Sequence, residues 1–256
     1  MPSSECTDDW SNFAVAKVLV PAGQAYDDVR AQWIRELDNL QSLRHPYVTF
    51  IHDAFEYRDT FYLIMERCHE QLSELISWPD LRPEVWLHPI AQCVLATLVH
   101  SQDGIRPYKD LHPGNVFVAR NQGVMSTPNP ATVFKVGDLG ISRLAPDIDV
   151  FNTILAKWML PPEALAPARF GVIGPQLDIY HAGLTFLSLM LRQIPTFSEQ
   201  EILDGRPRQL AESLPSPYGP VLSRALRRHV DQRTQSALDF WREIAAVRYT
   251  GGLLSG

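Results

Sequence analysis

The segment Tyr108–Phe117, YKDLHPGNVF, places three chemically capable side chains within six positions: Asp110, His112 and Asn115. A second aspartate, Asp138, stands in the motif VGDLG, directly after an expected strand. Carboxylate and amide oxygens are the ligands that Mg²⁺ prefers, and a carboxylate can also accept the proton of an attacking hydroxyl. The residue types and their spacing therefore point to metal-assisted transfer chemistry.

Two further charged residues lie upstream. Lys17 falls in the apolar run FAVAKVLV, and Glu36 falls on an expected helix that follows it. Transfer of phosphate from ATP needs a lysine on the α- and β-phosphates, a glutamate that holds this lysine, a carboxylate beside the attacking hydroxyl, and oxygen ligands for Mg²⁺. Each residue alone has an ordinary structural interpretation, such as a turn former or a solvated helix face. Together, and in this order, they supply the parts for phosphoryl transfer.

The elements that must position these residues divide the chain into two parts. The first part contains a β-rich run over residues 13–20, a helical pattern over 27–43, and two strand patterns over 47–56 and 60–67. We therefore expect residues 1–68 to form a small sheet with one helix.

The remainder of the chain, residues 69–256, is predicted to be mainly helical. Its expected helices cover residues 84–101, interrupted early by Pro89, and residues 178–192, 198–204, 218–230 and 235–247; short strands cover 115–119 and 132–137. The helix over 178–192 is apolar on nearly every face, which is typical of a helix buried inside a lobe. The predicted fold class is α+β with two lobes.

Eight motifs in order resemble those of the protein kinase family, over about residues 13–247. They are AVAK for the strand lysine, RELDNLQSLRHPYV for the αC helix, FYLIMERC for the strand into the hinge, YKDLHPGN for the catalytic loop, GDLG for the DFG motif, PPEAL for the APE motif, LDIYHAG for the αF helix, and VDQRTQSALDF near the C-terminus. The resemblance implies a kinase-like fold with a reduced N-lobe of about three strands plus αC, and a helical C-lobe.

The resemblance also implies catalytic roles. Asp110 is the expected base, Lys17 the residue that holds the phosphates, and Glu36 its partner. His112 is counted with them because it stands where serine/threonine kinases usually carry a lysine aimed at the transferring phosphate. Mg²⁺ is expected on Asn115 and Asp138.

The remaining implied residues bind ATP or support the site. The ATP-binding set is Val15, Lys17, Met65 as gatekeeper, the backbone of Glu66 and Cys68, and Phe117. The structural set is Glu163, which pairs with Arg233 in the family's pattern, and Asp178, which braces the catalytic loop.

The family's Gly-rich loop has no counterpart here. Only 16 residues precede Lys17, none of them is glycine, and the first glycine is Gly23. A hairpin that covers phosphates closely needs glycine so that its backbone can approach them. We therefore expect the first two strands and the phosphate lid to be missing, either naturally or by truncation.

Three functions remain open at this point. The first is an ATP- and Mg²⁺-dependent protein kinase that acts on Ser/Thr hydroxyls of a protein substrate. The second is a pseudokinase or scaffold, which the missing lid favours. The third is a small-molecule phosphotransferase of the aminoglycoside or choline kinase type, which shares the DLHPGN spacing; PPE, Asp178 and Arg233 favour a protein kinase over it.

Composition limits the classes of partner and the cellular compartment that we expect for this chain. The net charge of -6 and pI near 5.7, without a basic run, argue against a nucleic-acid partner. No apolar stretch is long enough to span a membrane. Three cysteines without a CxxC pair indicate a reducing compartment. We expect a cytoplasmic protein, or one delivered into a host cytosol, of unpredicted oligomeric state.

Overall fold

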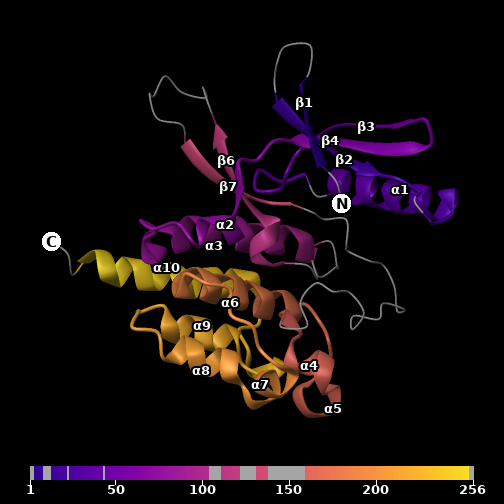
Figure 1. The fold of residues 1–256 in the computed structure, drawn as a ribbon. Helices are drawn as coiled ribbons and strands as arrows, with labels where there is room; N and C mark the ends of the chain where they lie inside the picture. The colour runs from indigo at the N-terminus through magenta and orange to yellow at the C-terminus, as the bar shows by residue number, and fades with distance from the viewer. Residues whose placement is uncertain are drawn as a thin grey trace.

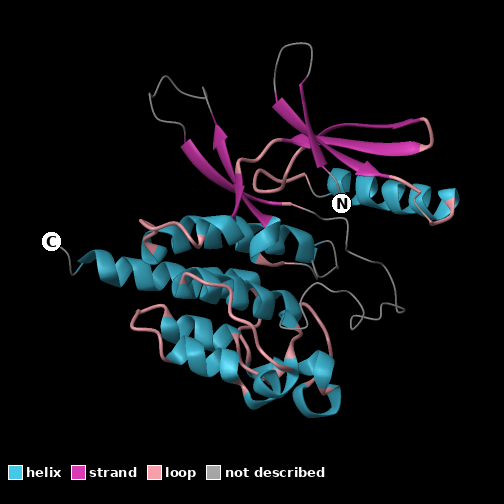
Figure 2. Cartoon of the chain, viewed as in Figure 1, coloured by secondary structure: helices cyan, strands magenta, loops and turns pink. Residues whose placement is uncertain are grey.

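The computed structural model describes residues 3–7, 13–21, 23–42, 44–103, 111–121, 131–137 and 159–253. A twisted sheet with one helix lies above a mainly helical part, and a second, smaller sheet rises from the top of the helical part beside the larger sheet (Figures 1 and 2). The architecture is the expected α+β arrangement of a small strand-rich lobe on a helical lobe.

The upper lobe holds a four-stranded antiparallel sheet in the order β1-β2-β4-β3. Its elements are β1 (Ser3–Thr7), β2 (Phe13–Leu19), α1 (Tyr26–Ser42), β3 (Ile51–Tyr57) and β4 (Thr60–Glu66). Tyr26 and Trp33 of α1 pack their rings against Phe61 of β4, each at 5.3 Å between centroids. This aromatic contact fixes α1 against the sheet that carries Lys17.

The expected count of three strands in this lobe is wrong by one. β1 pairs along its whole length with β2, and Ser3 stands opposite Lys17. The segment SSECT has no apolar alternation, so a search for apolar runs passes over it. An edge strand needs only backbone pairing on one side, which polar residues supply as well as apolar ones. At least one strand therefore precedes the lysine strand.

The lower lobe combines the small sheet with helices. The sheet has the order β5-β6-β7, from Glu70–Gln71, Val116–Asn121 and Ala131–Val136. The helices are α2 (Leu72–Leu75), α3 (Pro83–Asp103), η1 (Pro113–Asn115), α4 (Pro162–Leu165), α5 (Pro167–Phe170), α6 (Gln176–Leu191), α7 (Glu199–Asp204), α8 (Arg206–Glu212), α9 (Gly219–Ala225), η4 (Val230–Gln232) and α10 (Ala237–Leu253).

Helix α6 is the centre of this lobe, as its apolar composition predicted. Every residue from Leu177 to Leu189 is buried, and α3 and α9 pack against it. α3 runs through Pro89 without a break, contrary to the expected interruption, because buried residues on both sides outweigh one lost hydrogen bond. No helix in the described ranges is both long and apolar enough to cross a bilayer.

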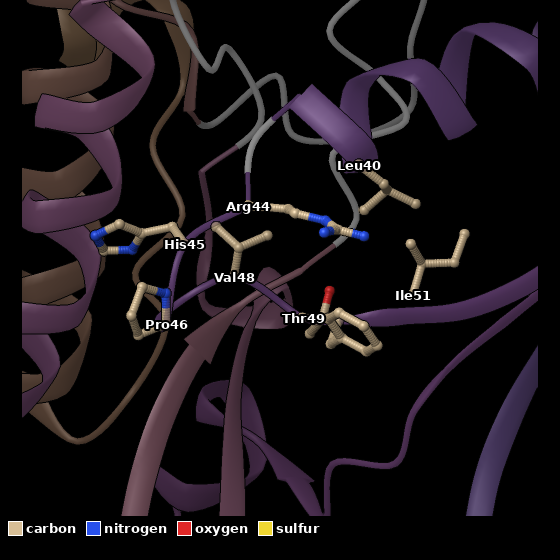
Figure 3. Close-up of a pocket in the computed structure, with 8 residues that line it drawn as sticks. Leu40, Arg44, His45, Pro46, Val48, Thr49 and Ile51 are labelled. Atoms are coloured by element: carbon tan, nitrogen blue, oxygen red, sulfur yellow. The ribbon is translucent and has the colours of Figure 1, made fainter.

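The two lobes are joined by backbone hydrogen bonds around Val136, the last residue of β7. The Val136 N–H donates to the Tyr47 carbonyl at 2.7 Å, and the Thr49 N–H donates to the Val136 carbonyl at 3.0 Å. Tyr47 and Thr49 belong to the loop between α1 and β3. This loop also forms one wall of a cavity of about 260 Å³ under α1, and Leu40 and Ile51 are among the other lining residues (Figure 3). The loop between α1 and β3 therefore belongs structurally to both lobes.

A buried ion pair ties the segments of the lower lobe together. Arg233 donates two parallel hydrogen bonds of 2.7 Å to the carboxylate of Glu163, and both side chains are 0% exposed. Arg233 also donates to the carbonyls of Gln176 and Arg227, at 2.8 and 3.0 Å, and lies over the ring of Tyr180. One side chain thus holds α4, the start of α6 and the loop after α9.

We expect Arg233→Met to lower the free energy of unfolding by about 3–5 kcal/mol, because it leaves the Glu163 carboxylate buried without its partner. The matched control is Arg224→Met, which breaks a partly exposed pair with Glu243 and should cost no more than about 1 kcal/mol. Urea denaturation of the three proteins measures both values. Equal losses in the two variants would contradict the assigned role of the buried pair.

Candidate functional site

A cleft of about 450 Å³ lies where the upper sheet meets the small sheet. All six residues that were expected to bind ATP line it: Val15, Lys17, Met65, Glu66, Cys68 and Phe117. They come from β2, the end of β4, the segment after it, and β6. The volume is within the range typical of small-molecule sites, roughly 300–1,000 Å³.

Lys17 and Glu36 form an ion pair inside this region. The Lys17 Nζ lies 2.6 Å from Oε1 of Glu36, and the two side chains are 17% and 2% exposed. β2 carries the lysine to the cleft, and α1, which packs against the same sheet, carries the glutamate that pairs with it. A buried carboxylate requires a partner of this kind, and the pairing holds the long lysine side chain in one orientation.

The segment that crosses between the lobes is secured on both sides. The Glu66 carboxylate pairs with Lys135 of β7, with Nζ–O distances of 2.6 and 2.8 Å. The Glu66 N–H donates to the Phe50 carbonyl at 2.9 Å, and the His69 N–H donates to the Val118 carbonyl at 2.8 Å. The crossing backbone, which includes Cys68, is therefore held in a fixed path along the wall of the cleft.

The floor of the cleft depends on a glycine. A Cβ atom at Gly137 would lie 2.5 Å from the ring of Phe117 and 3.1 Å from the Thr49 methyl group. Real Cβ atoms do not approach other atoms so closely, so only glycine lets the Phe117 ring keep its place. The Gly137 N–H also donates to the Asn115 carbonyl at 2.9 Å, which links the end of β7 to the turn η1.

The expected base, Asp110, and one of the two expected Mg²⁺ ligands, Asp138, lie outside the described residues. Asn115 is described: it closes η1 and is 5% exposed. His112 caps the same turn, and its Nδ1 accepts a hydrogen bond from the Gly114 N–H at 3.1 Å. In the neutral imidazole this leaves the proton on Nε2.

The residues expected to support the site lie in the lower lobe. Asp178 is fully buried in the first turn of α6. Glu163 and Arg233 form the buried pair described above.

Sequence reasoning missed several residues that line the cleft: Thr49, His69, Glu70, Gln71, Glu74 and Gly137. For Gly137 a signal existed, because a glycine directly before an aspartate at a strand end often marks a close approach of backbone. The others follow the crossing segment or belong to the α1–β3 loop, and no spacing rule distinguishes them. The Glu66–Lys135 pair joins residues 69 positions apart, so only the fold reveals it.

Comparison with known proteins gives a consistent result. Residues 3–248 match the family of the protein kinase domain. Cyclin-dependent kinase D-1 of Arabidopsis thaliana is 24% identical over 196 residues, which cover 74% of this chain and 45% of that protein. Serine/threonine-protein kinase DCLK3 of Homo sapiens is 27% identical over 169 residues, which cover 63% and 24%. The chain thus spans less than half the length of either relative.

Solved structures show the same fold. The PknI kinase domain of Mycobacterium tuberculosis is similar with a TM-score of 0.61 at 20% identity, over 92% of this chain and 86% of that chain. A double mutant of that domain gives a TM-score of 0.63 at 19% identity, over 96% and 90%.

Cys68 offers a test of the described cleft wall. Burial, followed by the nearby Glu66 carboxylate, raises the pKa of its thiol from an ordinary 9.0 to about 12. At pH 8 the thiolate fraction should be on the order of 10⁻⁴, rising about tenfold for each pH unit. Iodoacetamide labelling of the Cys68 peptide, followed by mass spectrometry between pH 7.5 and 9.5, should show this steady rise. The same protein in urea is the control and should label much faster; a plateau near pH 9 in the folded protein would rule out the buried environment.

Proposed function

Because this chain belongs to the protein kinase family, we propose that it transfers the γ-phosphate of ATP to Ser/Thr hydroxyls of a protein substrate, with Mg²⁺ as cofactor. The observation that carries the proposal is the Lys17–Glu36 ion pair of 2.6 Å at a cleft large enough for a nucleotide. Relatives named as serine/threonine kinases support the choice of hydroxyl. On this proposal, residues 1–68 are the reduced N-lobe and residues 69–256 the C-lobe of a cytoplasmic enzyme.

The lining of the cleft suits ATP. Val15, Met65 and Phe117 provide apolar surface for the adenine ring, and the backbone of Glu66 and Cys68 provides its hydrogen bonds. Lys17 holds the α- and β-phosphates, and Glu36 keeps the lysine in place without a further loss of side-chain entropy. Gly137 leaves room for the Phe117 ring that supports the base.

The chemistry itself is assigned to the loop residues. Asn115 and Asp138 hold Mg²⁺ through oxygen atoms, and the bound ion neutralises charge on the phosphates. Asp110 orients the substrate hydroxyl and accepts its proton. His112 is assigned to the transferring phosphate, because it stands where serine/threonine kinases usually carry a lysine, and its Nδ1 accepts a hydrogen bond from the Gly114 N–H.

A second candidate is a kinase fold without catalysis. A small-molecule phosphotransferase is the third possibility, and it shares the Asp110–Asn115 spacing. The following experiment separates all three.

We expect the purified chain with Mg·ATP to phosphorylate itself or proteins in a mixture, and Asp110→Asn to lower this rate by about 10²–10⁴-fold. ATP affinity should change little, because Asp110 is assigned to the proton and not to the nucleotide. The matched control is Asp80→Asn at an exposed position, which should leave the rate unchanged. Radiolabel transfer measures the rate, and calorimetry measures the affinity.

Other outcomes would overturn the proposal. If no label is transferred and Mg·ATP does not raise the melting temperature, the non-catalytic fold is supported, since a ligand that binds only the folded state must stabilise it. If label appears on an aminoglycoside or on choline but on no protein, the small-molecule alternative is supported.

A further inference from the structure

A second cavity, of about 420 Å³, lies between the α1–β3 loop, α3 and α10. Four rings line it: His45 and Tyr47 from the loop, His100 from α3, and Trp241 from α10. Most of the remaining lining is aliphatic. His45 lines both this cavity and the one beneath α1, and in Figure 3 its ring points away from Leu40 and Ile51 of the latter.

We propose that this cavity binds a neutral, flat aromatic or heteroaromatic small molecule, and that its occupancy alters the nucleotide cleft. The lining rings already form aromatic contacts. His45 and His100 stack at 5.2 Å between centroids with an interplanar angle of 28°, and His45 lies 5.5 Å from the Tyr47 ring. A flat ligand can extend such contacts, because offset and edge-to-face ring pairs are favourable at these separations.

The lining also defines the charge of the ligand. None of the described residues around the cavity is Lys, Arg, Asp or Glu. Burial, and then the neighbouring His100, lowers the pKa of His45, so the His45 imidazole stays uncharged at neutral pH. An ionised ligand would lose hydration here without gaining an opposite charge. Gln92 and His100, which are both exposed, can still hydrogen-bond a ring nitrogen.

Coupling to the cleft follows from the backbone bonds around Val136. Tyr47 lines the cavity, and its carbonyl accepts from the Val136 N–H. Thr49 lines the cleft, and its N–H donates to the Val136 carbonyl. Gly137, the next residue, also lines the cleft. A ligand that displaces Tyr47 must therefore shift two residues of the cleft; this part of the inference rests on the proposed nucleotide site.

Indole is a suitable probe for the binding site, with calorimetry performed in the absence of nucleotide. We expect indole to bind with a Kd below about 1 mM. The anion indole-3-acetate and the cation tryptamine should bind at least about tenfold more weakly, because the cavity offers neither of them an opposite charge. No binding of indole, or equal binding of all three compounds, would overturn the proposal.

Substitutions in the lining of the cavity test whether indole binds there. Ala96→Phe should fill the cavity and weaken indole binding at least about tenfold, whereas Ala168→Phe, at an exposed position on α5, should leave it unchanged. Leu238→Glu, at a residue 43% exposed, is the second cavity variant in case Ala96→Phe does not fold. Indole binding that survives in the folded cavity variants would place the ligand elsewhere and refute the assignment.

The coupling is measured separately, as the Kd of indole with and without saturating Mg·ADP. We expect a change of at least about fivefold, which is within the usual size of coupling between two sites. An unchanged Kd would refute the coupling alone. If Mg·ADP does not bind at all, the proposed nucleotide site fails and the coupling with it, while the measurements without nucleotide still decide whether the cavity binds its ligand.

Discussion

The structure depends on one constraint: two separate sheets must be held at a fixed relative position so that residues from both line a common cleft. Val136 satisfies this constraint, because its backbone N–H and C=O both form hydrogen bonds with the loop between α1 and β3. Such bonds are individually modest, but an unpaired buried N–H or C=O would be costly, so the loop and β7 are expected to move together. Lys17, on one side of the cleft, and Gly137, on the other, keep their separation for this reason.

Two ion pairs beside the cleft have complementary effects on this arrangement. The Lys17–Glu36 pair lies within the upper lobe and orients a side chain toward the cleft. The Lys135–Glu66 pair crosses from the end of β4 to β7 and secures the path of the backbone between the lobes. Partly buried pairs add little net stability once desolvation is counted, yet they exclude alternative arrangements, because either charge alone would be poorly accommodated. Their contribution here is to geometry.

Much of the fold followed from the sequence, because hydrophobic periodicity and an ordered set of motifs agree with each other. The apolar run of α6, the helix that carries Glu36, and the strand that carries Lys17 all gave local signals. Two features gave no local signal. β1 forms because it pairs with β2, and α3 continues through Pro89 because the residues around it are buried. The same distinction applies to the residues that line the cleft. Those within motifs were predicted from the sequence, whereas those on the segment that crosses between the lobes could be identified only from the three-dimensional fold.

The contacts of Arg233 have a consequence for how the lower lobe assembles. Its guanidinium needs acceptors from α4, from the start of α6 and from the loop after α9, so none of these segments alone can satisfy it. A partly assembled lobe would hold this cation, or the Glu163 carboxylate, in an apolar environment without compensation. Intermediates of that kind are strongly disfavoured. Folding of the three segments should therefore be cooperative, and in the native protein their amide hydrogens should exchange with solvent through a shared opening and not one segment at a time.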